Sequence, residues 1–279
     1  MKSHARSVII GGGAMGVGLL YHLAKEGWKD VVLIEKGELT SGSTWHAAGL
    51  IPHFIGSLNM AKIHFYGADL YKKLEEETGQ ATGWHGCGAI RLALDQDQVD
   101  WFHYVKGVLD QVGAECHLLG PDEIRKVHPL LETDGFLMGA YTTGDGHTDP
   151  SGATQAMAVG ARNRGAEIYL NNRVTDTKLL PSGEWEVITE KGTIICEHLV
   201  NAAGSFCEQV GSMAGIKVPM VNMVHQYLMT ETIPEVAALE KELPVVRDPR
   251  ASCYYRQEQS GLIIGPYEMN AKAWGLDGI

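Results

Sequence analysis

Trp45 and His46 lie at the centre of a stretch of small residues, TSGSTWHAAGL, which runs from Thr40 to Leu50. Small side chains allow a backbone to approach a bulky ligand closely. An indole and an imidazole in such a stretch would contact that ligand, and the imidazole brings a nitrogen that can act as a nucleophile. The stretch, named here the Trp-His loop, therefore predicts a ligand-binding loop with His46 at its centre.

Gly11, Gly13 and Gly16 form the pattern G-x-G-x-x-G directly after a short apolar run at residues 7–10. The first glycine of this pattern permits a tight turn, the second lets a pyrophosphate reach the backbone, and the third lets helix and strand pack closely. Glu35 ends the next apolar run, VVLIE, where a carboxylate can accept hydrogen bonds from ribose hydroxyls and repels the 2′-phosphate of NADP. This order of elements predicts a dinucleotide-binding βαβ unit.

The composition is that of an ordinary globular protein, with 44% hydrophobic and 20% charged residues among 279. A formal net charge of −11 argues against nucleic-acid binding, because an acidic surface repels phosphates. Five cysteines without C-x-x-C spacing indicate reduced thiols, and no ligand spacing predicts a metal site. No apolar run is long enough to cross a bilayer, and no targeting segment precedes residue 7, so we expect a cytoplasmic protein or a processed protein of the mitochondrial matrix.

Hydrophobic periodicity predicts the elements that position these residues. Helical patterns begin after Gly16 and end near Gly27, and they recur at residues 58–77, 95–113, 121–131 and 150–164. Strand patterns cover residues 31–35, 88–94, 135–143, 167–180, a hairpin at 183–204, and runs at 219–231, 251–258 and 261–268. The alternation predicts an α/β fold in which a Rossmann-like domain (1–83 and 145–219) is interleaved with a mainly β, α+β substrate domain (84–144 and 220–279).

The order of the motifs GGGAMG, VVLIEK, GSTWHAAGL, GHTDPSG, NNRV, LVNAAG and HQY resembles the D-amino-acid-oxidase-like flavoproteins. Within them the chain is most similar to the family of dimethylglycine and sarcosine dehydrogenases and oxidases. The resemblance covers essentially the whole chain, and STWHAAG is its most discriminating motif. It implies FAD as the cofactor, with His46 bonded covalently to the 8α carbon of FAD, so that the bulky ligand of the Trp-His loop is the isoalloxazine ring.

The same resemblance implies which residues line the FAD besides the three glycines and His46. They are Ala14, Met15, Glu35, Lys36, Ser43, Thr44, Trp45, Ala47, Ala48, Leu50, Val174, Ala203 and Gly204. Val174 would present its backbone to the adenine, while Ala203 and Gly204 would lie near the pyrophosphate or the flavin. One position departs from the family pattern, because Phe206 stands where relatives commonly carry Trp. That departure puts the local packing in question.

Two predicted strands supply candidate catalytic residues. In HQY, a period of two places His225 and Tyr227 on one face of a strand. A histidine of this motif lies in the family's active site, and a neutral imidazole can accept or orient the amine proton. In CYYRQE only one of Tyr254 and Tyr255 can face the flavin, and we expect Tyr255. Ordinary packing in the core or the sheet is the alternative for all of them.

Arg256 is expected either to pair with a substrate carboxylate or to lie at the surface. His85 and His147 are close to glycine loops, and the sequence assigns them no role.

The resemblance implies oxidative demethylation of an N-methylglycine-type amine, either dimethylglycine or sarcosine. Hydride would pass to FAD and water would release formaldehyde, with oxygen or an electron-transfer flavoprotein as the final acceptor. Two alternatives stay open. An NAD-linked Rossmann dehydrogenase would need no Trp-His loop, and a catalytically silent flavin-binding subunit would hold FAD without being reduced by such amines.

The sequence stops at AWGLDGI without a closing strand or a capped helix. We therefore expect an N-terminal fragment that alone binds flavin poorly. Many relatives continue into a folate-binding domain, which makes tetrahydrofolate a further candidate partner of the whole protein.

Overall fold

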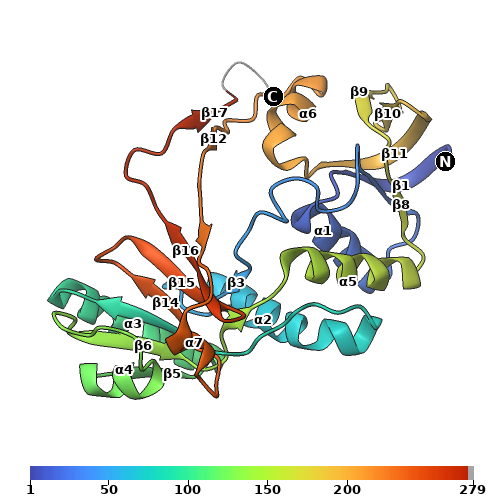
Figure 1. Ribbon diagram of the computed structural model, residues 1–279. Coiled ribbons are helices and arrows are strands. Elements are labelled where there is room, and N and C mark those ends of the chain that lie inside the picture. Colours follow the sequence, from blue (N-terminus) through green and yellow to red (C-terminus); the bar gives the residue numbers. More distant parts are fainter. Residues whose placement is uncertain (276–279) are drawn as a thin grey trace.

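The computed structural model describes residues 1–275, so residues 276–279 of the predicted substrate domain lie outside the described part. Two large sheets organise the chain, one of six strands and one of seven. Figure 1 shows them at opposite ends of the molecule, with helix α2 (Leu58–Thr78) running between them. Leu70 and Leu74 of α2 pack into the core beside the first sheet, and Ala61 packs into the core beside the second.

The six-stranded sheet has the order β8-β2-β1-β11-β10-β9. Its strands are β1 (His4–Ile10), β2 (Val31–Ile34), β8 (Glu167–Tyr169), β9 (Val174–Leu179), β10 (Trp185–Thr189) and β11 (Gly192–Asn201). The four strands β8, β2, β1 and β11 run parallel, and the β9–β10–β11 meander continues the sheet antiparallel.

Both faces of this sheet are buried, as expected for parallel strands. Ile9 and Leu33 point to the face covered by α1 (Ala14–Lys25) and α5 (Pro150–Asn163). Val8 and Val32, one residue earlier in each strand, belong to the core on the opposite face.

The seven-stranded sheet has the order β13-β16-β15-β14-β4-β6-β5. Its strands are β4 (Ala89–Ala93), β5 (Cys116–Leu119), β6 (Met138–Thr142), β13 (Leu228–Met229), β14 (Val245–Asp248), β15 (Cys253–Glu258) and β16 (Gly261–Pro266). Helix α3 (Gln96–Val112) packs against Ala93 on one face, and α4 (Pro121–Val127) packs against Ile90 on the other.

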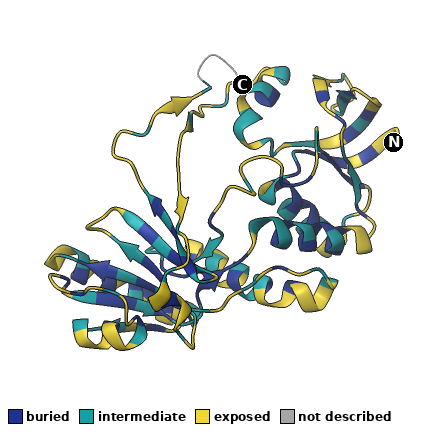
Figure 2. Ribbon diagram, viewed as in Figure 1, coloured by how far each residue is buried: buried dark blue, intermediate teal, exposed yellow. Residues whose placement is uncertain are grey.

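Shorter elements complete the chain: β3 (Leu50–Ile51) paired with β7 (Gly146–His147), β12 (Asn222–Met223) paired with β17 (Ala273–Trp274), the 3-10 turn η1 (Gly204–Phe206), α6 (Cys207–Met213) and α7 (Pro234–Ala237). Figure 2 shows β12 and β17 as largely exposed ribbons, whereas the interiors of both large sheets are buried.

Local sequence explains where the main helices begin and end. The Asp95 side chain accepts a hydrogen bond from the Gln98 N–H at the start of α3, and Gly113 ends that helix in the left-handed conformation. At α5 the Asp149 carboxylate caps two N–H groups, and Pro150 occupies the first turn, where no donor is needed. No helix within residues 1–275 is long and apolar enough to cross a membrane.

The predicted fold class is confirmed, because a largely parallel sheet covered by helices and a second, mainly antiparallel sheet are both present. The strands of each large sheet fall inside the range predicted for one domain, although the domain boundaries themselves stay a prediction. Two strand predictions are wrong. Residues 167–180 are divided into β8 and β9, with Asn171 at a left-handed φ of 51° between them.

The second error concerns residues 219–231, which contain only β12 and β13. Residues 224–227 belong to no strand because the segment changes partner there: β12 pairs with β17, and β13 pairs with β16. His225 and Tyr227 therefore do not lie on a strand, and the period-two argument does not apply to them.

Candidate functional site

The glycine turn between β1 and α1 leaves no room for side chains. A Cβ on Gly16 would lie 1.9 Å from the Gly11 carbonyl oxygen, and a Cβ on Gly11, whose φ is +116°, would lie 2.3 Å from the Ala202 carbonyl oxygen. Only glycine fits at these two positions. The turn therefore opens the N-terminus of α1 to an anionic ligand, and it fits a pyrophosphate.

Glu35 lies directly beside this turn. Its two carboxylate oxygens accept hydrogen bonds from the N–H groups of Gly12, at 2.7 Å, and Gly37, at 2.8 Å. A cavity of about 70 Å³ next to it is lined by residues that the sequence assigned to the cofactor, namely Gly11, Glu35, Lys36, Val174 and Ala203. Segments far apart in the chain thus meet at one hollow beside the glycine turn.

Phe206 also lines this cavity, and it contacts Lys36. The Lys36 Nζ lies 3.1 Å from the centroid of the Phe206 ring, and burial lowers the pKa of this ammonium group. The position that departs from the family pattern therefore still provides an aromatic face for the neighbouring cation. Gly204, with a φ of 56°, begins the 3-10 turn that carries Phe206.

The Trp-His loop is bonded to the glycine turn at two places. The Thr40 N–H donates to the Gly12 carbonyl at 3.0 Å, and the Thr44 hydroxyl accepts from the Ala14 N–H at 3.0 Å. Ser43 approaches Ser205 beyond β11, with 3.4 Å between the hydroxyl oxygens. The loop thereby starts at the N-terminus of α1, where a dinucleotide would lie.

His46 is exposed, and its ring is held from one side only. Nδ1 lies 3.1 Å from the Gly42 carbonyl oxygen, and the Trp45 ring packs at a centroid distance of 4.0 Å. Because a carbonyl oxygen can only accept, Nδ1 carries the proton and Nε2 carries the free lone pair. Trp45 and Met15 are also largely exposed, so all three side chains are accessible to a ligand from the same part of the molecule.

The end of the Trp-His loop packs on the seven-stranded sheet. Ala48 forms a small buried cluster with Tyr254 and Ile263, and Leu50 packs against it. The Arg256 side chain donates from Nε to the Ala48 carbonyl at 2.9 Å and pairs with Glu258 at 2.7 Å. Both expectations for Arg256 are wrong, because its side chain is 8% exposed and occupied in holding the loop.

Three side chains share one face of the seven-stranded sheet because their residues are directly paired across neighbouring strands. Arg91 on β4 pairs with Arg247 on β14, and Arg247 pairs with Tyr254 on β15. The next partner is Gly265 on β16, where a Cβ would lie 2.0 Å from the Tyr254 ring, so the ring rests on a glycine. This row runs from the end of the Trp-His loop towards Arg91.

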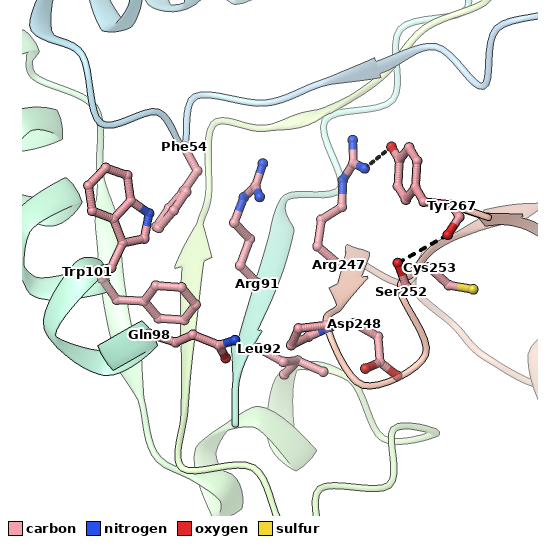
Figure 3. A pocket seen from close by; sticks show the side chains of 12 residues that line it. Phe54, Arg91, Leu92, Gln98, Trp101, Arg247, Asp248, Ser252, Cys253 and Tyr267 are labelled. Carbon is pink, nitrogen blue, oxygen red and sulfur yellow. Dashed lines mark hydrogen bonds between the residues drawn. The ribbon is translucent and has the colours of Figure 1, made fainter. Parts of the chain in front are cut away.

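Arg91 and Arg247 line an open pocket of about 290 Å³, named here the arginine pocket, together with Phe54, Trp101 and Tyr267. Figure 3 shows both guanidinium groups pointing to the same side of the sheet, between the aromatic rings. Arg247 donates a hydrogen bond to the Tyr267 hydroxyl. Arg91 packs its guanidinium 4.9 Å from the Phe54 centroid, and none of the described residues accepts a hydrogen bond from it.

Burial lowers the pKa of the Arg91 guanidinium, and the adjacent charge of Arg247 lowers it further. Two like charges with little neutralisation favour an anion between them, and a carboxylate matches the fork of donors that a guanidinium offers.

Tyr255 points to the opposite face of the same sheet. It packs in the cluster that contains Ile124 and Phe136, its hydroxyl lies 3.4 Å from Asp248, and burial raises its pKa to about 12. The choice of Tyr255 over Tyr254 was therefore wrong about which ring faces the Trp-His loop. Tyr254 faces that loop.

His225 contacts Tyr267, and Tyr267 lines the arginine pocket. The two rings stack with centroids 5.1 Å apart and planes 15° apart, and the His225 Nδ1 lies 3.6 Å from a Glu268 carboxylate oxygen. Tyr227 is exposed and lies near Tyr254, whose pKa is raised mainly by burial and to a smaller degree by the neighbouring tyrosines. His225, Tyr227 and Tyr254 therefore lie on one side of the molecule with Arg247.

The sequence analysis missed Arg91, Arg247 and Tyr267. A signal was present for the two arginines, because GAIRLAL places one arginine in an otherwise apolar strand and VVRD places one directly after two valines. A buried charge in such a position needs a partner, and a ligand is one candidate.

A glycine turn with an acidic residue beyond β2, closed by a loop that reaches a second sheet, defines a dinucleotide-dependent oxidoreductase. Residues 6–278 match the model of the family described as FAD dependent oxidoreductase (DAO). The chain belongs to this family, so the predicted resemblance is confirmed, and FAD is the cofactor that the family indicates. The NAD-linked alternative is not favoured.

Two named members of this family are similar to the chain over nearly its whole length. The chain is 48% identical over 271 residues to the rat (Rattus norvegicus) mitochondrial dimethylglycine dehydrogenase, covering 97% of this chain and 32% of that protein. It is 36% identical over 280 residues to the human mitochondrial sarcosine dehydrogenase, covering 98% and 30%. The chain thus spans about a third of the length of these curated relatives.

Among solved structures, the L-proline dehydrogenase from P. horikoshii superposes with a TM-score of 0.84 and 29% identity, covering 95% of this chain and 70% of that one.

Proposed function

We propose that the chain carries the flavin and amine sites of an enzyme that oxidises an N-methylated amino acid, with dimethylglycine or sarcosine as the substrate. The observation that supports this most is the row Arg91, Arg247 and Tyr254, which runs from a cationic pocket to the Trp-His loop. A carboxylate-binding group and a flavin-binding loop joined in this way suit a small amino acid. The similarity to the two dehydrogenases agrees with it.

The chain's own residues would bind FAD from the glycine turn to the Trp-His loop. The glycine turn and the N-terminus of α1 would hold the pyrophosphate, Glu35 would bind the ribose, and Val174 would border the adenine. When bound, FAD supplies the acceptor for a hydride. Thr44, Ala47 and the other small residues of the Trp-His loop would then lie along the ring system.

We propose that His46 attaches FAD covalently through Nε2, the nitrogen with the free lone pair. The bond would replace an 8α C–H and an imidazole N–H, and the two electrons and two protons released would pass to an external oxidant such as oxygen. A covalent link would prevent loss of the cofactor and favour its reduction.

On the substrate side, Arg91 and Arg247 would bind the carboxylate and orient the amine towards the Trp-His loop. His225 would accept or orient the amine proton, since an amine must be neutral to give up hydride from its methyl carbon. Tyr254, with Tyr227 near it, would form the wall that excludes water. The resulting iminium would be hydrolysed by water to formaldehyde and the demethylated amine.

Partners of the whole protein follow from the same class of reaction. The electrons would leave to oxygen or to an electron-transfer flavoprotein, and tetrahydrofolate would accept the one-carbon unit at a further domain. Both relatives are mitochondrial by name, which favours the mitochondrial matrix over the cytoplasm.

The test uses the full-length flavoprotein in two steps. Acid precipitation should leave flavin on the protein, and His46→Ala should release it, while the exposed control His117→Ala should retain it. Anaerobic dimethylglycine or sarcosine should then bleach the visible flavin absorption. A folded protein whose flavin is retained but bleached by neither amine would be the silent flavin-binding subunit, and the proposed reaction would be abandoned.

A further inference from the structure

His85, His147 and Glu242 come together although they lie in three distant parts of the chain. The backbones of His85 and His147 pair directly, with N–H to carbonyl distances of 2.8 and 3.0 Å. Directly paired residues in an antiparallel bridge present their side chains on the same side. The two imidazole rings accordingly stack, with centroids 4.6 Å apart and planes 11° apart.

The Glu242 carboxylate bridges the two rings. One oxygen lies 2.8 Å from the His85 Nδ1, and the other lies 2.7 Å from the His147 Nε2. Burial opposes ionisation of Glu242, but hydrogen bonds from His147 and His85 outweigh it and lower the pKa of the carboxyl group. The carboxylate is therefore charged at neutral pH, and both nitrogen atoms point towards it.

We propose that His85, His147 and Glu242 bind a divalent transition-metal ion, with Zn²⁺ as the ion that this ligand set suits best. Two imidazole nitrogens and one carboxylate oxygen, with water in the fourth position, are a common zinc ligand set. The three ligand atoms already lie within 4.8 Å of one another. Tetrahedral zinc needs them about 3.4 Å apart, at metal–ligand distances of about 2.0–2.2 Å.

To bind an ion, the side chains of the cluster must move, and this movement is needed only on the solvent-accessible side. Stacked rings cannot both aim a lone pair at one ion, so one of them must turn. The His147 side chain is only 6% exposed and is held by the β3–β7 pair, whereas that of His85 is 52% exposed and can turn on the solvent side, exchanging its contacts with Glu242 and His147 for the ion. Each imidazole must also carry its proton on the other ring nitrogen, so that the nitrogen facing the ion offers its lone pair.

Because of where the cluster lies, a bound ion would connect separate parts of the fold. His147 follows the Trp-His loop through the β3–β7 pair, His85 precedes β4, and Glu242 precedes β14. Those two strands carry Arg91 and Arg247. An ion here would tie the loop to the strands of the arginine pocket. The inference does not rest on the proposed function, because it uses none of the residues assigned to flavin or substrate.

This site could not be predicted from the sequence, because the three ligands have no characteristic spacing. Only the pairing of residue 85 with residue 147, and the return of the chain before β14, bring them together.

The experiment uses tag-free, full-length flavoprotein stripped with a chelator and then titrated with Zn²⁺ alone. Equilibrium dialysis with elemental analysis should find one Zn²⁺ per chain, and added Zn²⁺ should raise the melting temperature. Glu242→Gln and His147→Gln should each weaken binding by about tenfold or more, since even outer-shell changes at zinc sites cost 10- to 100-fold.

The matched control is His117→Gln, because His117 pairs with Glu115 at 2.9 Å but, within residues 1–275, belongs to no group of three potential metal ligands. This variant should bind Zn²⁺ as the parent does. Retention of flavin shows that each variant has folded, and Glu242→Gln preserves the shape of the side chain if His147→Gln is unstable. Failure to take up stoichiometric Zn²⁺, or equal uptake by parent and ligand variants, would overturn the proposal and leave a purely hydrogen-bonded cluster.

Discussion

Arg91 and Arg247 are neighbours across two strands, and their positive charges repel one another in a partly buried pocket. Such a pair is costly in the absence of a compensating anion, since burial disfavours the charged form of Arg91 and the two like charges repel. The two adjacent positive charges are therefore better explained by binding of an anionic ligand than by a contribution to the stability of the fold. The aromatic rings of Phe54 and Tyr254, each near one guanidinium, reduce that cost only in part.

The first prediction concerns Arg247, which points into the pocket and also donates to Tyr267. Arg247→Met should raise KM for dimethylglycine about tenfold to a hundredfold, as expected for losing one or two charge-assisted hydrogen bonds. A tertiary N-methyl amine without a carboxylate should be oxidised by variant and parent at similar KM. Steady-state kinetics with both amines checks this. An equal loss for the two amines would mean that Arg247 does not recognise the carboxylate.

The exposed Arg250 provides a matched control at the rim of the same sheet. It bonds the Asp134 carbonyl and lies outside the arginine pocket, so Arg250→Met should change neither KM.

At the level of elements, the sequence predicts that neighbouring side chains of a strand point to opposite faces of the sheet. It does not predict which face each side chain points to. Tyr254 and Tyr255 are both half-apolar residues on β15, and both faces of that sheet are covered. In a sheet with one solvent-exposed face, the alternation of polar and apolar residues would have revealed the buried face. Here both tyrosines pack against buried residues, one on each face of the sheet. The helices α1 to α5, whose ends depend on local residues, were predicted to within a few residues, whereas the short helices α6 and α7 were not predicted. The region of His225, which changes sheet partner, was not predicted correctly either.

The second prediction concerns the end of α4, where His128 is 7% exposed and its Nδ1 has no hydrogen-bond partner among the described residues. Burial lowers the pKa of His128 from its ordinary value of 6.5 to about 4. The folded state therefore binds fewer protons than the unfolded state between these pH values. Stability should be fully present above pH 6.5 and decline as the pH falls towards 4, by up to about 3 kcal/mol at 1.36 kcal/mol per pKa unit.

His128→Met should remove this decline, because methionine fills the same apolar site without a proton to gain. The measurement is the difference between the unfolding free energies of variant and parent across pH 4 to 7, with the exposed His117→Met as the control. Parallel pH profiles for His128→Met and the parent would contradict the prediction.

At the scale of the whole molecule, the interleaving of the two sheets follows from the order of motifs along the chain. The contacts between the two sheets do not follow from that order. Ala48 and Arg256 are separated by 208 positions, and no periodicity relates them. The contact exists because the Trp-His loop leaves one sheet and ends on the other, so its carbonyl groups need donors from β15. Contacts of this kind depend on the complete three-dimensional arrangement, which a single sequence does not specify locally.

Arg256 is therefore expected to connect cofactor attachment to the packing of the two sheets. Arg256→Met would leave the buried Ala48 carbonyl without its donor, at a cost of about 1–3 kcal/mol, and would release the end of the Trp-His loop. The variant should show less covalently attached flavin and faster proteolysis within residues 40–50, whereas Arg256→Lys, which keeps a donor, should be affected less. Flavin content after acid precipitation and mass mapping of early cleavage sites measure both effects. Unchanged flavin content together with unchanged cleavage in Arg256→Met would mean that the loop is held without this contact, through the Ala48, Tyr254 and Ile263 packing alone.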